Sequence, residues 1–130
     1  MDDIITAIPY NKEDTVLNIF NDFHPRLVFI IELEKSDFSI PFLDVLLLHQ
    51  TNGSIDTKWW QKPHNSGRYI HYTSSCPYHY KINVAKNLIN RAYRLTSIKH
   101  IKEIDNKLVD LLITNGYPHK LICKLLKKKA

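Results

Sequence analysis

Apolar residues recur at helical spacing through the second half of the chain. From Lys81 to Ile98 they are three or four positions apart, and Lys86, Arg91 and Arg94 lie on the opposite arc. This stripe comprises Ile82, Ala85, Leu88, Ile89, Ala92 and Leu95. Ile101–Thr114 repeats the pattern, and a shorter apolar stripe follows Pro118. Residues 81–130 are therefore predicted to form a bundle of about three helices.

The last two of these helices are separated by a clear stop signal. Asn115-Gly116 favours the left-handed conformation that ends a helix, and Pro118 can open the next one. Two helices joined by so short a turn form a helix–turn–helix unit. The segment predicts such a join at Asn115–Pro118.

A β-hairpin is predicted between residues 42 and 61. Phe42–His49 is an apolar run, Asn52-Gly53 is the preferred pair for a type I′ turn, and Ile55–Gln61 returns. Trp59 and Trp60 then point to opposite faces of the return strand. One or both could pack in a core, or one could remain exposed for a partner.

The first forty residues carry weaker patterns. Asp2–Ile8 is interpreted as a short strand, Glu13–Phe23 as a helix, and Leu27–Glu34 as a half-buried strand. The fold class expected is α+β, with a small antiparallel sheet or β-hairpin followed by a three-helix bundle. The domains expected are residues 1–63, a linker over 64–80, and a helical domain over 81–130.

Charge is divided unequally between the two halves. Residues 1–57 contain three basic and ten acidic residues, whereas residues 58–130 contain fifteen basic residues and three acidic ones. The net charges are −7 and +12. A region as basic as the second half attracts polyanions, of which nucleic-acid backbones are the commonest.

Several other classes of protein are disfavoured. The longest apolar runs are far shorter than the roughly 20 residues of a membrane-spanning helix, and Asp2 and Asp3 lie where a signal peptide would be basic. Two cysteines make a poor disulfide framework, and Cys76-Pro77-Tyr78-His79 has no second ligand pair at zinc-finger spacing. No nucleophile elbow, phosphate loop or HExxH helix is present. We therefore expect an intracellular, nuclear protein that does not bind a membrane.

Three features could carry chemistry. Asp2-Asp3 could hold a divalent metal if a further carboxylate completed the site. Trp60 beside Lys62 could stack on a base while the lysine meets a phosphate. The third feature is the basic helical half, whose candidate backbone contacts, together with Trp60 and Lys62, are Arg68, Lys81, Lys86, Arg91, Arg94, Lys99, Lys120 and Lys124. Lys102 and Lys107 belong to the same basic faces.

The order of these features resembles the end of the reverse transcriptase of Penelope-like retroelements, from the catalytic turn through the thumb. The most specific match is Ile40-Pro41-Phe42-Leu43-Asp44-Val45, which is similar to the family's Pro-Phe-Leu-Asp signature. Met1-Asp2-Asp3-Ile4 resembles the tail of its aromatic-x-Asp-Asp turn, and Trp60-Gln61-Lys62-Pro63 resembles its Tyr-Arg-Lys-Pro hairpin end. The further matches are Phe23-His24-Pro25, Phe29–Glu34, Tyr69-Ile70, Ser74, Pro77, Lys81, Arg91-Ala92 and Asn115-Gly116-Tyr117-Pro118.

This resemblance implies a palm end, a primer-grip hairpin and a helical thumb that holds a primer–template duplex by its backbone. Asp2 and Asp3 would be the remnant of the catalytic site, and Mg²⁺ would serve the complete enzyme. The third aspartate, the fingers, the earlier palm and the endonuclease are not in the sequence. We therefore expect a truncated fragment that binds without polymerase activity, and without a cofactor or a metal site of its own.

Two other functions remain open. A small helix–turn–helix regulator could read DNA with Pro118–Lys129, although that helix offers only His119, Lys120 and Lys124 as readers. A protein-interaction module could instead use an exposed tryptophan and the basic helices to meet an acidic partner.

Overall fold

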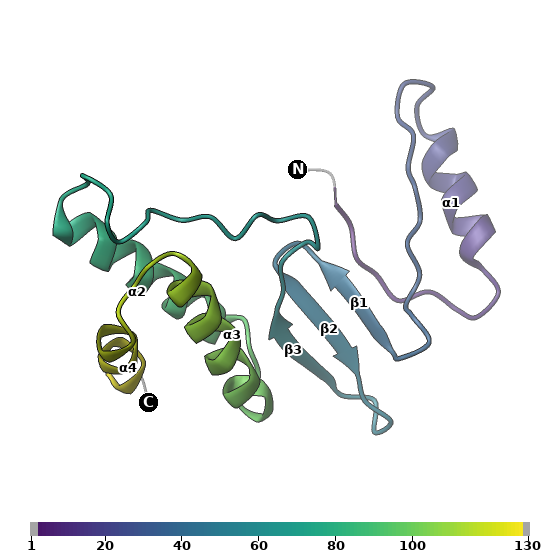
Figure 1. Cartoon of the computed structure of the whole chain (residues 1–130). Coiled ribbons are helices and arrows are strands. Elements are labelled where there is room, and N and C mark those ends of the chain that lie inside the picture. Colours follow the sequence, from purple (N-terminus) through teal and green to yellow (C-terminus); the bar gives the residue numbers. More distant parts are fainter. Residues whose placement is uncertain (1–2, 129–130) are drawn as a thin grey trace.

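A computed structural model describes residues 3–128 and has an α+β architecture, as the sequence predicts (Figure 1). A three-stranded antiparallel sheet in the order β1-β2-β3 lies between α1 on one side and three helices on the other. The elements are α1 (Glu13–Asp22), β1 (Ser39–Phe42), β2 (Val45–His49), β3 (Ile55–Trp59), α2 (Tyr78–Arg94), a 3₁₀ turn η1 (Ile98–His100), α3 (Ile101–Thr114) and α4 (His119–Lys127).

The helical predictions are largely confirmed. The helix α3 has the predicted bounds, α1 ends one residue early, and α4 begins directly after Pro118. The helix α2 starts three residues before Lys81 and ends at Arg94, before the predicted Ile98. Gly116 is left-handed with φ of 80°, so the predicted stop between α3 and α4 is present.

Two predicted strands are wrong. Residues 3–8 form no strand, and Asp2 lies outside the described residues. Leu27–Glu34 is extended but also forms none, because no neighbouring strand supplies a hydrogen-bonding ladder. Instead, the backbone N–H of Phe29 donates a hydrogen bond to the side-chain oxygen of Asn21 at 2.6 Å. Ile31 and Leu33, two apolar residues of this expected half-buried strand, are 37% and 55% exposed.

The predicted hairpin is present with two differences. Phe42–His49 is not one strand, because a tight turn at Leu43 and Asp44 separates β1 from β2 and adds a third strand to the sheet. The turn after β2 is not type I′, which requires positive φ at both central residues. Gly53 alone has it, at 81°, and Asn52 instead accepts hydrogen bonds from Ser54 through its side chain.

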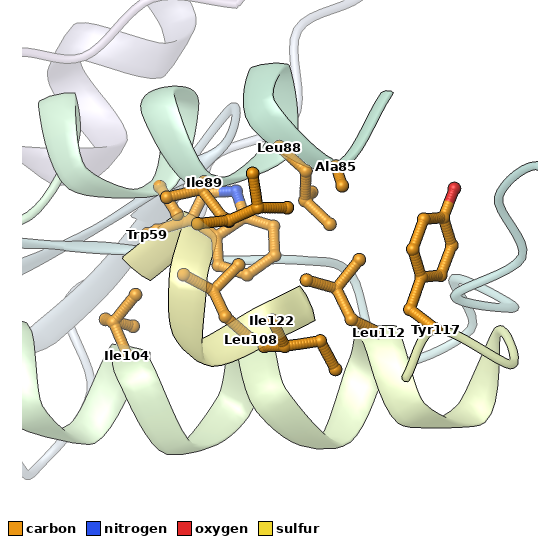
Figure 2. Packing of buried hydrophobic residues seen from close by; sticks show 11 residues of the cluster. Trp59, Ala85, Leu88, Ile89, Ile104, Leu108, Leu112, Tyr117 and Ile122 are labelled. Carbon is orange, nitrogen blue, oxygen red and sulfur yellow. The ribbon is translucent and has the colours of Figure 1, made fainter. Parts of the chain in front are cut away.

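The hydrophobic core lies among the three C-terminal helices and includes one residue of the sheet. Trp59 from the end of β3 is 4% exposed and lies among Ile89, Leu108 and Ile122 (Figure 2). The other buried apolar residues are Ala85, Leu88, Ala92, Ile104, Leu112, Tyr117 and Leu125. Burial of each large side chain contributes about 1.5–3 kcal/mol, so this cluster is the main source of stability.

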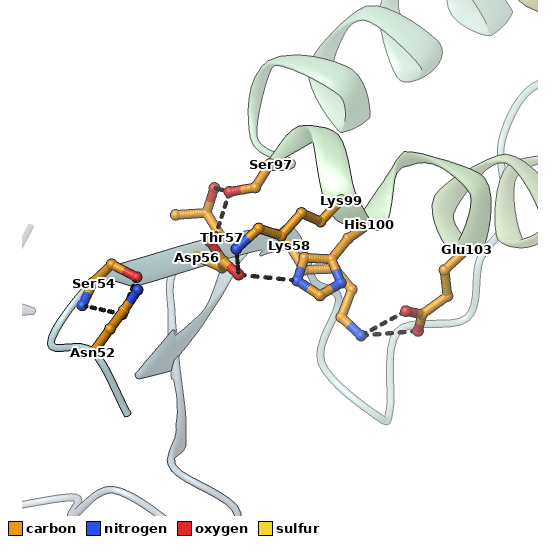
Figure 3. A network of polar contacts seen from close by, with 9 residues as sticks. All are labelled: Asn52, Ser54, Asp56, Thr57, Lys58, Ser97, Lys99, His100 and Glu103. Atoms are coloured by element: carbon orange, nitrogen blue, oxygen red, sulfur yellow. Dashed lines mark hydrogen bonds and ion pairs between the residues drawn. The ribbon is translucent and has the colours of Figure 1, made fainter. Parts of the chain in front are cut away.

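A polar seam joins the outer edge of β3 to the helices (Figure 3). Thr57 donates its N–H to the Ser97 hydroxyl at 2.9 Å and accepts from the Ser97 N–H at 2.8 Å. Lys58 contacts Glu103 at 2.8 Å, and this ion pair holds the pKa of Glu103 below its usual value. The seam gives hydrogen-bond partners to the backbone of Thr57 on the edge strand, and it fixes the sheet against α2 and α3.

The segment between sheet and helices is tied to the helix–turn–helix by one buried amide. Asn115 accepts from the N–H of Tyr69 at 2.8 Å and donates to the carbonyl oxygens of Gly67 and Leu111. Tyr117 donates its hydroxyl to the carbonyl of Ile70 at 2.9 Å. Residues 67–72 therefore pack on the helices, while the expected boundaries at 63 and 80 stay a prediction.

No helix among residues 3–128 combines the length and the apolar character that crossing a bilayer requires.

Candidate nucleic-acid interface

The outer face of α2 carries the densest group of polar and basic side chains near the sheet. Its apolar stripe faces the core, so helical geometry places the remaining positions outward. This outward face consists of Asn83, Lys86, Asn87, Asn90, Arg91 and Arg94. Arg91 and Arg94 lie in the last turn, where the partial negative charge of the helix end favours cations.

A hollow of about 620 Å³ lies between this face and the turn that joins β1 to β2. Asn87, Asn90, Arg91 and Arg94 line it from the helix. The turn between β1 and β2 contributes Phe42, Leu43, Asp44 and Val45, and Leu95 lines the hollow from the end of α2. Amide and guanidinium donors thus converge on one concave surface, an arrangement suited to an anionic ligand.

A second hollow, of about 1250 Å³, brings together four residues singled out from the sequence. Asp3, Trp60, Lys62 and Arg91 all line it, although they come from separate parts of the chain. Arg26 and His64 add positive or titratable groups, whereas Glu32 and Asp44 add acids. Trp60 is half-buried and Lys62 is exposed, so a stacked base and a phosphate could reach them together.

The two hollows share the residues that separate them. Phe42, Leu43, Asp44 and Arg91 line both. The Arg91 guanidinium donates to the Asp44 carboxylate across this boundary, and both side chains are substantially exposed. We call the two hollows and their shared boundary the groove. Arg94 lines one end of it and Lys62 lines the other hollow.

Besides Arg91, two of the predicted contacts already have partners within the protein. Lys81 donates to the carbonyl of Ser74 at 2.7 Å and lies 5.7 Å from the ring centre of Tyr72. Lys99 lies 3.4 Å from Asp56, in the seam between sheet and helices. Neither lysine lines the groove.

The other predicted basic residues are exposed but do not all lie together. Lys86 is exposed on α2 beside the groove, and Arg68 is exposed in the segment before that helix. Lys120 and Lys124 are exposed on α4, a different surface, while Ile122 and Leu125 face the core. The structure therefore divides the predicted contacts between the groove and the outer face of α4.

Lys107, which the sequence assigns to a basic face, has a structural role. Its ammonium lies 4.8 Å from the ring centre of Trp59, and burial lowers its pKa, with nearby Lys58 adding to the effect. Asn87 and Asn90 were missed by attention to charge alone. Their helical spacing with Arg91 and Arg94 was the signal that could have found them.

The catalytic remnant cannot be assembled from the described residues. Asp2 lies outside them, and Asp3 is exposed. Residues 3–128 contain no group of three His, Cys, Asp or Glu side chains placed to hold a metal ion. Cys76 and Cys123 are both free thiols. The described residues alone therefore do not supply the carboxylates of the two-metal site that the resemblance implies for the complete enzyme.

Comparison with known proteins supports the predicted helix–turn–helix unit. Residues 68–127 match the family model described as an animal helix-turn-helix domain. The match covers somewhat less than half of the chain, begins in the segment that Asn115 ties down, and ends with α4. No curated protein and no solved structure matches the chain. The matched segment is a helix–turn–helix domain, a class that generally binds nucleic acid.

Proposed function

We propose that this protein binds a nucleic-acid duplex by its phosphate backbone, without reading the sequence. The observation that carries the proposal is the groove, where Arg91 and Arg94 converge with Asn87 and Asn90 on one concave surface. In the parent enzyme, which we propose to be a Penelope-like reverse transcriptase, the bound duplex would be the primer–template.

The distribution of charge supports this assignment. Lys62, Lys86 and Arg94 are exposed, and no ion pair joins them to an acid among residues 3–128. Such cations gain most from a phosphate backbone, because binding releases the counterions condensed on the duplex. Of the described residues, three acids, Asp3, Glu32 and Asp44, line the second hollow, whereas Asp44 is the one acid that lines the first hollow beside Arg91 and Arg94. The excess of cations is therefore concentrated in the first hollow.

The second hollow supports the polymerase origin more specifically. The resemblance implies that the aspartate remnant and the hairpin end at Trp60 and Lys62 serve one primer end. Asp3, Trp60 and Lys62 line a common hollow. This proximity supports a palm end beside a primer grip.

We propose that this chain by itself binds and does not polymerise, and that binding needs no cofactor. Among the described residues, Asp3 has no pair of carboxylates beside it to bracket metal ions. Incorporation of labelled nucleotide by the purified protein, on a primed template with Mg²⁺, would contradict this. The nuclear location stays a prediction.

The binding proposal is tested by affinity for an RNA–DNA primer–template duplex as salt is raised from about 50 to 200 mM. The logarithm of the association constant should fall linearly with the logarithm of salt concentration. Arg94→Gln should weaken binding to all sequences alike and reduce the slope by about 1. Lys12→Gln removes the same charge beside α1, outside both hollows that form the groove, and should leave the slope nearly unchanged.

Flat salt dependence, or no binding at about 50 mM salt, would refute backbone binding. Equal slopes for the two variants would refute the placement in the groove while leaving nucleic-acid binding in force.

A sequence-reading helix–turn–helix protein is the second candidate, and the family match favours it. In that function α4 would enter the major groove with His119, Lys120 and Lys124 exposed. The helix carries no arginine, asparagine or glutamine for bidentate base contacts. Enrichment of one DNA site from a random pool, lost in Lys120→Ala, would favour this candidate over backbone binding.

A further inference from the structure

The turn at Leu43 and Asp44 is held in an unusual conformation. Leu43 has φ of 55°, in the left-handed region that branched apolar residues rarely adopt. The turn is fixed on both sides, by the pairing of Phe42 with Val45 and by the N–H of Trp60, which donates to the carbonyl of Asp44 at 2.8 Å. A strained residue persists only where its surroundings hold it, and such sites are often functional.

The effect of this turn is to place one carboxylate in the middle of the groove. Asp44 pairs with Arg91 at the boundary that both hollows share. The side chain of Asp44 is 45% exposed and that of Arg91 is 63% exposed, so the pair is open to solvent and contributes little to stability. Stability therefore does not account for the presence of the Asp44–Arg91 pair at the centre of the groove.

We infer that Asp44 occupies the place of a backbone phosphate, holding Arg91 in position until a nucleic-acid strand displaces it. This inference rests on the proposed function and adds a regulatory contact to it. A carboxylate and a phosphate use the same guanidinium donors, so only one of them can pair fully with Arg91. Bound nucleic acid must therefore compete with Asp44.

The competition selects for long polyanions. A free phosphate would have to displace Asp44 with a single contact. A strand that crosses the groove also meets Arg94 in one hollow and Lys62 in the other, and these contacts offset the loss of the Arg91–Asp44 pair. The ligand class is therefore a nucleic-acid backbone of several consecutive phosphates.

Salt dependence distinguishes this arrangement from an ordinary ion pair. In the natural protein the freed Asp44 carboxylate stays near Arg91, so the two groups together bring almost no net charge to the duplex and release almost no counterion. Arg91 then adds almost nothing to the slope. Once Asp44 is neutral, the same contact should add about 0.9 to the slope.

The test measures duplex affinity of the full chain across the same salt series for Asp44→Asn, Arg91→Gln and the double variant. Asp44→Asn should bind about three- to tenfold more tightly near 50 mM salt and have a slope steeper by about 1. Arg91→Gln alone should change little, and in the Asp44→Asn protein it should remove the gain. Thermal melting of each variant should stay close to that of the natural chain.

Asp110→Asn is the matched control. Asp110 is exposed on α3, lines neither hollow, and has no ion pair with any residue from 3 to 128. The substitution changes net charge by the same amount, so it measures the general effect of charge on affinity. Asp44→Asn should exceed it both in affinity and in slope.

The outcomes separate this inference from the proposed function. If the natural chain binds the duplex and Asp44→Asn binds no more tightly than Asp110→Asn, Asp44 does not compete and the inference is overturned, while backbone binding stands. If only Asp44→Asn binds, the proposed function is wrong for the natural chain, while the competition of Asp44 with the duplex is supported. If neither binds, both are wrong.

Discussion

Asn115 provides the sharpest test of how the helix–turn–helix is held to the chain before it. The side chain is 5% exposed and makes three hydrogen bonds, to the N–H of Tyr69 and to the carbonyls of Gly67 and Leu111. Substitution by alanine would leave the Tyr69 donor and the Gly67 acceptor without partners. Leu111 would keep its bond from the backbone N–H of residue 115, at 3.3 Å.

The expected loss follows from counting these groups. A buried donor or acceptor left unpaired costs about 1–3 kcal/mol, and Gly67 is half-buried, so water can partly replace its bond. Asn115→Ala should therefore lower the free energy of unfolding by about 2–4 kcal/mol, with a fall in Tm of roughly 10 °C for a chain of this size. Urea denaturation followed by circular dichroism measures the first quantity, and thermal melting the second.

The matched control is Asn106→Ala on the exposed side of the same helix α3. Its side chain makes no hydrogen bond to any residue between 3 and 128, so the change should stay within about 0.5 kcal/mol. If Asn115→Ala costs less than about 1 kcal/mol, water replaces the amide and residues 67–72 are not anchored as we describe.

Asn115→Asp tests the same position through the direction in which stability changes with pH. A carboxylate there accepts from Tyr69 but repels the carbonyl oxygens of Gly67 and Leu111, so burial and repulsion raise its pKa above the usual value of about 3.9. The folded protein then binds the proton more tightly than the unfolded chain. Stability of this variant should increase as pH falls through the raised pKa and decrease as pH rises through it.

Two further predictions concern the turn and one phenol. Gly116→Ala should lower the free energy of unfolding by about 1–2 kcal/mol because its backbone is left-handed. A clash adds to this loss, since the new Cβ would lie 2.4 Å from His71 Cε1. Adding His71→Ala should recover only the loss due to the clash, as measured by urea denaturation. Burial and a hydroxyl bond to Asp105 raise the pKa of Tyr93, so the folded state keeps this proton longer and stability falls as pH rises above about 10. Tyr93→Phe should flatten that alkaline loss in melting curves taken from about pH 9 to 11, and an unchanged slope would contradict the assignment.

The sequence predicted the helices well because their cause is local. A stripe at helical spacing determines which face of a helix is buried, whatever covers it, and α3 accordingly has the predicted bounds. A strand depends on a partner elsewhere in the chain, so the alternation over Leu27–Glu34 could not reveal that none is beside it. In the turn at Leu43 and Asp44, the positive φ is at Leu43 and not at the turn-forming Asp44, so no local signal indicated it.

The groove was predictable only in part. Charge and aromatic residues identified Trp60, Lys62, Arg91 and Arg94, and the structure places these residues along one surface. The ion pair between Asp44 and Arg91 could not be predicted, because the two residues are 47 positions apart and no local pattern joins them. Composition likewise cannot separate Lys86, which has no ion pair with any residue from 3 to 128, from Lys99, which is also exposed but pairs with Asp56.

Trp59 makes the helical unit dependent on a residue from outside the matched family segment. That segment begins at residue 68, yet the indole from β3 is part of its core. Residues 68–127 on their own would contain a void the size of an indole, and α2 and α3 could not close fully around it. The hairpin is therefore the final piece of the helical core. Rearrangements of this domain over evolution would carry the hairpin along, or replace its tryptophan from another source.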